Sequence, residues 1–358
     1  MTHYLNNTLR QFLHEGTVIP AHPLALTEKR QLDEKRQRLL TRYYLDSGAG
    51  GVAVGVHTTQ FEIRKPEVNL LDKVLELAAD EITKANLSRP FLKIAGICGP
   101  TDQALREADL ALRYGYHIGL VSLGGLNSLS DDQLIDHLRA VSEKIPVFGF
   151  YLQPAVGGRL LSYEFWKRMA DLPNVVGVKI AAFNRYQTLD AVRGICDSSR
   201  CEDIALYTGN DDNIVADLLT PYRLNARGER PEKRFVGGLL GHWAVWTGKA
   251  VELLDEVKSC VGTNYQGSEA LLAKGISVTD MNAAIFDAKN SFRGCIAGIH
   301  EVLKRQGILR GTWCLNPAEQ LSPGQMEEID RILRAYPDLI DNAFVEEFLR
   351  KNEAFLNE

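Results

Sequence analysis

Short apolar segments rich in β-branched residues alternate with longer helical patterns about eight times along the chain. The expected strands are Thr17–Ile19, Gly51–Val56, Phe91–Ile97, Ile118–Leu123, Val147–Leu152, Val175–Ile180, Ile204–Tyr207 and Arg234–Gly238. The expected helices between them are 33–45, 68–85, 102–114, 131–143, 163–170, 188–195 and 212–219. Because such alternation builds a parallel sheet with helical crossovers, the chain is predicted to be an α/β protein. About eight repeats within roughly 260 residues favour a closed (β/α)₈ TIM barrel over an open doubly wound sheet.

The pattern changes towards the C-terminus, where only helical segments follow. We therefore expect a barrel domain that carries the active site over residues 1–262 and a C-terminal helical region over residues 263–358. Within that region, Ser322-Pro323 is typical of a helix start, with an N-cap serine followed by proline at the first helical position. No GxGxxG motif follows the first strand, which weakens a dinucleotide-binding alternative.

Composition excludes several classes of partner. The formal net charge is −5, and Lys and Arg are scattered along the chain, so no nucleic-acid partner is expected. No apolar run reaches the roughly 18 residues that span a bilayer, and the polar N-terminus lacks the apolar core of a signal peptide. The six cysteines form no CxxC pair, which indicates free thiols. A metal bound through His and carboxylate stays possible, but there is no HExxH motif, and no metal site is predicted. We expect a cytoplasmic protein without a membrane partner.

Two reactive side chains stand near the ends of expected strands, where (β/α)₈ enzymes place their active sites. Lys179 lies near the end of the apolar run Asn174–Ala182, in which a buried charge is costly unless it has a partner or a function. Desolvation favours the neutral amine, the form that attacks a carbonyl, although a lysine at a strand end can also extend its head group into solvent. Tyr151 lies near the end of the strand before it, and a phenol beside an amine can relay protons, although a tyrosine at a strand end is more often structural.

The loop Gly55–Glu62, after the second expected strand, supplies further candidates. Its Thr58 and Thr59 hydroxyl groups, with nearby backbone N–H groups, are candidates for binding a substrate carboxylate. His57 is a candidate general base or substrate ligand, and a loop histidine is also common without any function.

These residues fit a known family. The segment Tyr151-Leu-Gln-Pro, then Gly158, Leu161-Ser-Tyr-Glu and Leu172-Pro-Asn-Val-Val-Gly-Val-Lys179, resembles the dihydrodipicolinate synthase/N-acetylneuraminate lyase family of class I aldolases. That family carries a tyrosine in a Y-N-x-P motif and a Schiff-base lysine in a P-x-[IV]-x-G-[IVL]-K motif, separated by 28 residues as here. Thr208–Asp212 resembles its S/T-G-x-D segment, and Gly237-Gly238 its glycine pair.

The resemblance implies a mechanism. Lys179 would form an imine with a 2-oxo acid of the pyruvate type, and Tyr151 would relay protons. Thr58, Thr59, His57 and Gly238 would contact the substrate. No cofactor is implied, because the protonated imine is itself the electron sink. An aldehyde is the second partner in the aldolase direction, and a homo-oligomer, a dimer or tetramer, is implied by the family.

Three departures separate the chain from the dihydrodipicolinate synthases. The carboxylate loop differs from their G-T-T-G-E, Val156 replaces an arginine, and Leu123–Asn127 lacks their relay tyrosine. Since each positioned acid, base or cation supplies about 10²–10⁴-fold in rate, the sequence argues against dihydrodipicolinate synthesis. The prediction is a lyase or aldolase acting on a 2-oxo acid. The alternatives are a sugar-acid dehydratase that uses the same imine and a non-catalytic barrel that binds a 2-oxo acid.

Overall fold

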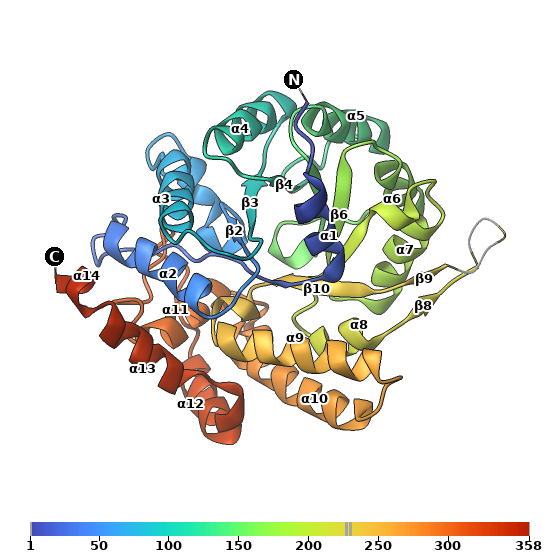
Figure 1. The fold of residues 1–358 in the computed structure, drawn as a ribbon. Coiled ribbons are helices and arrows are strands. Elements are labelled where there is room, and N and C mark those ends of the chain that lie inside the picture. The colour runs from blue at the N-terminus through green and yellow to red at the C-terminus, as the bar shows by residue number, and fades with distance from the viewer. Residues whose placement is uncertain (1, 226–227, 229–230, 358) are drawn as a thin grey trace. The chain divides into compact units, whose positions relative to one another are not determined.

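The computed structural model describes residues 2–225, 228 and 231–357, and the chain divides into two compact units. The first comprises Met1–Thr17 and Leu92–Leu239, and the second comprises Val18–Phe91 and Leu240–Glu358. Strands and helices alternate along the described residues in the order expected of a (β/α)₈ barrel (Figure 1). The predicted domain boundary between residues 262 and 263 falls directly after a helix that ends at Gly262. The division of the chain into domains at this point stays a prediction.

The first unit contains six parallel strands in the order β10-β7-β6-β5-β4-β3. Its strands are β3 (Leu92–Ile97), β4 (Ile118–Val121), β5 (Val147–Leu152), β6 (Val175–Ala181), β7 (Ala205–Thr208) and β10 (Phe235–Leu240). Its helices are α1 (Asn7–Glu15), α4 (Thr101–Arg113), α5 (Asp131–Ser142), α6 (Tyr163–Ala170), α7 (Arg185–Cys196) and α8 (Ile214–Leu219). Every residue of β5 and β6 is buried, as expected for parallel strands covered on both faces.

The two faces of this sheet have different neighbours. Helices α4 to α7 lie around its outer face, whereas α1 lies across the strands in the view of Figure 1. Tyr207 of β7 donates its hydroxyl hydrogen to the Leu13 carbonyl of α1 at 2.9 Å, so Tyr207 and α1 are on one face. On the outer face, a Cβ on Gly149 would lie 2.6 Å from the sulfur of Met169 in α6.

Side-chain caps fix where several helices begin. Ser130 and Gln133 form a reciprocal capping box at α5, and Ser162 caps α6. Helix α7 begins at Arg185, three residues before the predicted start, because Asn184 accepts hydrogen bonds from two backbone N–H groups of its first turn. The first unit also contains two elements that were not predicted, helix α1 and the antiparallel pair β8 (Tyr222–Arg223) and β9 (Glu232–Lys233).

The second unit contains β1 (Val18–Pro20) and β2 (Gly51–Val54), which lie side by side with a parallel bridge between Ala21 and Ala53. Its helices are α2 (Glu34–Asp46), α3 (Leu71–Lys84), α9 (Thr247–Gly262), α10 (Ser268–Ile285), α11 (Cys295–Arg305), α12 (Gln325–Ala335), α13 (Asn342–Lys351) and α14 (Glu353–Asn357). The expected helical C-terminal region is therefore present. The predicted cap at Ser322-Pro323 is wrong: α12 begins at Gln325, and the Ser322 hydroxyl donates to Asp287 instead.

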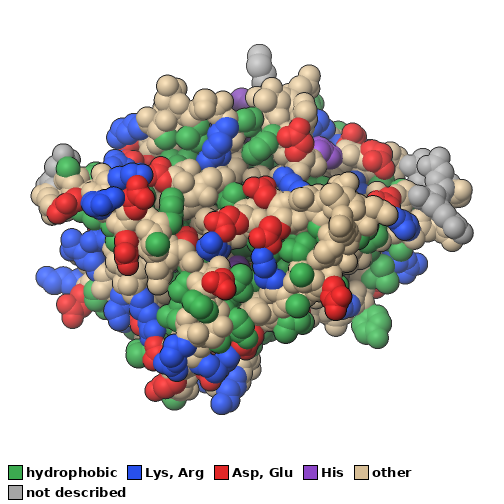
Figure 2. All heavy atoms as spheres, turned by 60° about the horizontal axis from the view of Figure 1, so that its bottom comes forward, with side chains coloured by type: hydrophobic (Ala, Val, Ile, Leu, Met, Phe, Trp, Pro, Cys, Tyr) green, Lys and Arg blue, Asp and Glu red, His purple; other side chains and the backbone are tan. Residues whose placement is uncertain are grey.

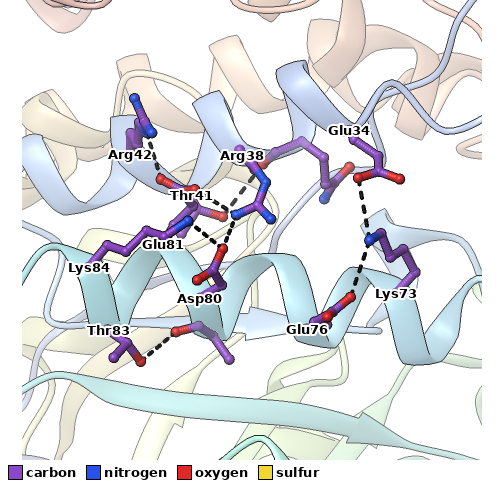
Figure 3. Close-up of polar contacts among 12 residues, drawn as sticks. Glu34, Arg38, Thr41, Arg42, Lys73, Glu76, Asp80, Glu81, Thr83 and Lys84 are labelled. Atoms are coloured by element: carbon purple, nitrogen blue, oxygen red, sulfur yellow. Dashed lines mark hydrogen bonds and ion pairs between the residues drawn. The ribbon is translucent and has the colours of Figure 1, made fainter. Parts of the chain in front are cut away.

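Ion pairs join α2 to α3 in this unit (Figure 3). The buried Glu81 carboxylate accepts from Arg38 at 2.7 Å and from Arg42 at 2.6 Å, and Lys73 lies 3.4 Å from Glu34. Elsewhere, acidic and basic side chains are interspersed with hydrophobic ones on the face shown in Figure 2. Among the described residues, no helix is long and apolar enough to cross a membrane.

Candidate active site around Lys179

Lys179 is a buried cation on the face of the sheet opposite the outer helices. It is the fifth residue of β6, 9% exposed, and is paired with Phe150 of β5 and Tyr207 of β7. Residues paired across a parallel sheet project from the same face, so the three side chains lie together. The Lys179 Nζ lies 4.4 Å from the centroid of the Phe150 ring, within the range of a cation–π interaction.

Burial shifts the titration of this amine. Desolvation lowers the pKa of Lys179 from 10.5 to about 8, and the negative charge of Asp211 opposes part of that shift. At pH 7 about a tenth of such an amine is neutral, against roughly three parts in ten thousand for an ordinary lysine. Lys179 is therefore a far better nucleophile at neutral pH than an exposed lysine.

A turn after β7 brings Asp211 to this lysine. The Gly209 N–H donates to the Ile180 carbonyl at 2.7 Å, and the Asp211 N–H donates to the Gly209 carbonyl at 3.1 Å. A Cβ on Gly209 would lie 2.5 Å from the Cε of Lys179, closer than real Cβ contacts come. Only glycine lets the turn press against the lysine stem, which places a carboxylate two residues further on within electrostatic reach of Nζ.

Asp217 of α8 holds that turn from the outer side of the sheet. Its Oδ2 accepts from Thr208 Oγ1 at 2.7 Å and Asn210 Nδ2 at 2.9 Å, and its Oδ1 accepts from Asn213 at 3.1 Å and from Arg185. Asn210 Oδ1 also accepts a hydrogen bond from the backbone N–H of Phe183, two residues after the end of β6. The loops after β6 and β7 are therefore tied together through buried side chains.

The structure does not place Tyr151 beside Lys179. Tyr151 is paired with Ile180, so it projects from the opposite face of the sheet, where its ring lies 5.1 Å from that of Trp166 in α6. Burial raises the pKa of Tyr151, a hydrogen bond with the backbone of Leu161 opposes this rise, and the charge of Asp190 in α7 adds to it. The proton-relay role of Tyr151 stays a prediction, and its surroundings are those of a residue packed against the outer helices.

The predicted carboxylate loop belongs to the second unit. His57, Thr58 and Thr59 form a short 3₁₀ helix after β2. Both threonine hydroxyls donate to the His22 carbonyl, at 3.2 Å from Thr58 and 2.7 Å from Thr59, and Thr59 Oγ1 also accepts from the N–H of Gly55. The His57 ring lies 5.9 Å from that of Phe61. The hydroxyl hydrogens therefore serve the local fold, and the substrate-binding roles of these three residues stay predictions.

Gly238, the remaining predicted substrate-binding residue, lies in β10 of the first unit. It is paired with Thr208, on the outer face, and its N–H donates to the Thr17 carbonyl at 3.3 Å. Its role also stays a prediction. Sequence analysis singled out neither Phe150 nor Asp211 as site residues, although the Thr208–Asp212 segment was noted as part of a family motif. Among the described residues, no group of three or more His, Cys, Asp or Glu side chains is arranged to hold a metal ion.

The model of the Dihydrodipicolinate synthetase family matches residues 15–221, more than half of the chain. The chain belongs to the dihydrodipicolinate synthetase family. The matched segment includes Lys179, Tyr151, Phe150 and Asp211, and it agrees with the family named from the motifs above.

Relatives in this family differ in their activities. The 4-hydroxy-tetrahydrodipicolinate synthase of Aromatoleum aromaticum is 28% identical over 204 residues, which cover 56% of this chain and 64% of that protein, less than two thirds of its length. N-acetylneuraminate lyase 2 of Escherichia coli O6:H1 is 21% identical over 318 residues, 88% of this chain and 92% of that one. The solved dihydrodipicolinate synthase of Oceanobacillus iheyensis has a TM-score of 0.71 at 17% identity, covering 92% of this chain and 99% of its own. This likeness confirms the predicted (β/α)₈ fold.

Proposed function

We propose that this protein is a lyase or aldolase that acts on a 2-oxo acid of the pyruvate type through a Schiff base on Lys179. One observation carries the proposal: a buried lysine near the carboxyl end of a parallel strand, whose pKa is lowered to about 8, in a chain of this family. A neutral amine at this position is a competent nucleophile for a ketone carbonyl. The relatives named above are a synthase and a lyase, and both names fit chemistry of this class.

The protonated imine explains how such a site works without a bound cofactor. Once Nζ of Lys179 replaces the ketone oxygen, the iminium withdraws electrons from the neighbouring carbon. A C–C bond at that carbon can then break or form, and the electron pair is held as an enamine. The ring of Phe150 beneath Nζ would stabilise the positive charge of the iminium through its π face.

Within this class, the chain favours substrates other than that of dihydrodipicolinate synthesis. Val156, in the short 3₁₀ helix after β5, cannot bind a second carboxylate as an arginine does. The loop Leu123–Asn127 after β4 supplies no phenol. We propose a substrate whose part beyond the 2-oxo acid group is uncharged, such as a hydroxylated aldehyde or sugar acid.

Borohydride trapping tests the proposal directly. Wild type, Lys179→Ala and Lys93→Gln would be incubated with pyruvate and a panel of 2-oxo acids, reduced and weighed by intact-protein mass spectrometry. Lys93 is the matched control, because burial also lowers the pKa of this lysine, which lies in β3 of the same unit. We expect the mass of a reduced imine on wild type and Lys93→Gln, mapped to Lys179, and none on Lys179→Ala.

The outcomes separate the alternatives. Trapping followed by release of an aldehyde from longer 2-oxo acids supports the aldolase, whereas loss of water without C–C cleavage indicates the dehydratase. If no acid of the panel is trapped on folded wild-type protein, the Schiff-base proposal is wrong and a binding protein becomes the better account.

The proposal also covers the oligomeric state of the protein and its place in the cell. We propose a homo-oligomer, on the strength of the family alone, and a cytoplasmic location, which the six free cysteines of the described chain support. Analytical ultracentrifugation tests the first of these statements.

A further inference from the structure

The turn at Gly209 lies directly against the side chain of Lys179. A Cβ on Gly209 would lie 2.5 Å from Cε and 3.1 Å from Cγ of the lysine, and 2.9 Å from the Cβ of Ala181. The Gly209 N–H also donates at 2.7 Å to the carbonyl of Ile180, in the strand that carries the lysine. The backbone of the turn therefore forms one wall around the aliphatic stem of Lys179, so that a movement of the turn changes the space around that stem.

Both neighbours of Gly209 are fixed by one buried oxygen atom. Asp217 Oδ2 accepts from Thr208 Oγ1 at 2.7 Å and from Asn210 Nδ2 at 2.9 Å. Thr208 Oγ1 in turn accepts from the Asn210 N–H at 3.1 Å. Thr208 and Asn210 are fully buried, and Asp217 is 1% exposed. Gly209 is therefore held between two anchored residues, and it can move away from the lysine stem only if these hydrogen bonds break.

The same carboxylate also reaches the segment that follows the strand of Lys179. Asp217 Oδ1 accepts from Arg185, the first residue of α7, and Asn210 Oδ1 accepts from the Phe183 N–H at 2.9 Å. Three of the four hydrogen-bond donors of Asp217 thus lie at the end of β7 or after β6, on the two segments that flank the lysine. Burying a carboxylate is costly, and here its hydrogen bonds join those two segments.

We propose that Asp217 is a positioning residue, which holds the turn after β7 against the stem of Lys179 and so fixes the position and the burial of its amine. Because Lys179 is the nucleophile of the proposed function, this role rests on that proposal. Asp217 lies in α8 on the outer side of the sheet and acts on the lysine through Gly209.

Burial makes the amine reactive near neutral pH, since desolvation lowers the pKa of Lys179 from 10.5 to about 8. A turn that moves away admits water, so the pKa rises, and the neutral fraction at pH 7 falls about tenfold for each pH unit. A misplaced nucleophile loses further rate, by up to about 10²-fold for a displacement of 1 Å. Loss of the anchor therefore has two measurable effects, a higher Lys179 pKa and slower imine formation.

The groups that face Lys179 keep their identity when the anchor is removed. Strand β5 presents the Phe150 ring, and β7 presents Tyr207, whose hydroxyl donates to the Leu13 carbonyl at 2.9 Å. The turn is followed by Asp211, whose charge opposes part of the effect of burial on the lysine pKa. Removing the negative charge of Asp217 by itself would lower the pKa of a lysine, which is opposite in sign to the effect of a loosened turn.

A first experiment needs no substrate. Competitive acetylation at a series of pH values, with peptide mass mapping, gives the pKa of the Lys179 amine in each variant, measured at low temperature on protein whose circular dichroism shows it folded. We expect this pKa to rise by about one pH unit in Asp217→Ala and also in Asn210→Ala, which removes no charge. Asp217→Asn keeps an acceptor for the turn and should titrate close to wild type. Asp190→Ala in α7, whose carboxylate is 51% exposed, is the matched control and should not change the titration.

The opposite signs make this result decisive. A lowered Lys179 pKa in Asp217→Ala would mean that the carboxylate acts through its charge, and an unchanged pKa in both Asp217→Ala and Asn210→Ala would mean that the turn does not depend on the anchor. Either outcome overturns the positioning role. If Asp217→Ala does not fold, Asn210→Ala decides the question by itself, because it breaks the hydrogen bonds of the turn and leaves every charge in place.

A second experiment measures the rate of imine trapping with pyruvate as a function of pH. We expect the midpoint of the pH–rate profile to move upward in Asp217→Ala and Asn210→Ala by the same amount as the acetylation pKa, and the rate at pH 7 to fall about tenfold or more. Asp217→Asn should recover most of the wild-type rate. A purely structural role would lower the amount of folded protein at every pH and leave the midpoint unchanged, and that result would refute the proposal.

The two readouts also separate this role from the proposed function. If wild type traps no 2-oxo acid, the proposed function is wrong, while the acetylation pKa values still decide whether Asp217 controls the burial of the Lys179 amine. If wild type traps pyruvate on Lys179 and Asp217→Ala has the same titration and the same pH–rate profile, only the positioning role is wrong.

Discussion

Replacing Asp217 should destabilise the protein, by an amount that depends on which of its hydrogen-bond donors are left without an acceptor. Its carboxylate is 1% exposed and accepts four hydrogen bonds, two at each oxygen. The donors at Oδ2, Thr208 and Asn210, are fully buried. Those at Oδ1, Arg185 and Asn213, are partly exposed, and Arg185 keeps 43% of its side-chain surface in solvent.

This asymmetry predicts an order of effects. In Asp217→Asn the amide can turn its oxygen to Thr208 and Asn210 and leave its NH₂ facing the partly exposed pair, which water can rehydrate. The expected loss is about 1–2 kcal/mol, for the charge and the weaker acceptor. Asp217→Ala leaves both buried donors unpaired, at about 1–3 kcal/mol each, so about 3–5 kcal/mol is expected in total.

Thermal unfolding followed by circular dichroism measures the order, since 1 kcal/mol corresponds to roughly 2–4 °C for a chain of this size or somewhat smaller. The control is Asp190→Ala in α7, where the carboxylate is 51% exposed and its pair with Arg193 spans 3.4 Å, and a change below about 0.5 kcal/mol is expected. If Asp217→Ala unfolds no earlier than Asp217→Asn, the argument from unpaired buried donors is wrong.

Two further predictions concern the second unit. Glu81→Ala should lower the free energy of unfolding by about 2–3 kcal/mol, because Arg38 and Arg42 lose a carboxylate that is 3% exposed (Figure 3). Lys84→Ala is the control: its lysine is 61% exposed, and a change of less than about 0.5 kcal/mol is expected. Urea unfolding of both variants measures the difference. Burial lowers the pKa of His22 from 6.5 to about 4, so the unfolded chain binds the extra proton between these values and stability falls as pH drops from 6.5 towards 4. His22→Gln should reduce the slope of stability against pH by up to about 1.4 kcal/mol per pH unit, and an unchanged slope would contradict this assignment.

Much of the fold was predictable because it depends on local patterns. The expected strand over Val147–Leu152 matches β5, and the helix over Tyr163–Ala170 matches α6, since apolar runs and capping serines are visible in the sequence. The pair β8 and β9 was missed because two-residue strands carry no periodicity. The cap of α12 was misjudged because Ser322 finds a better acceptor in Asp287, 35 positions away, which the local sequence does not reveal.

The candidate site could be predicted from the sequence only in part, for the same reason. Lys179 was identified from a motif and an improbable buried charge, both of which are properties of one segment. Asp211 belongs to the site only through the Gly209 turn, whose closeness to the lysine stem depends on how two strands pair. A sequence that lists several aspartates in loops does not tell which of them faces the amine.

The position of Tyr151 depends on a single residue in the register of β5 and β6. Tyr151 and Lys179 are 28 residues apart, and Val147 pairs with Val175 at that same separation. Between Val147 and Phe148 the register shifts, so that Phe148 pairs with Gly177, 29 residues on, and Val176 is the extra residue. Because side chains alternate along a strand, that one-residue shift puts Phe150 beside Lys179 and turns Tyr151 to Trp166. A spacing that matches the family is therefore insufficient to place the two side chains on one face of the sheet.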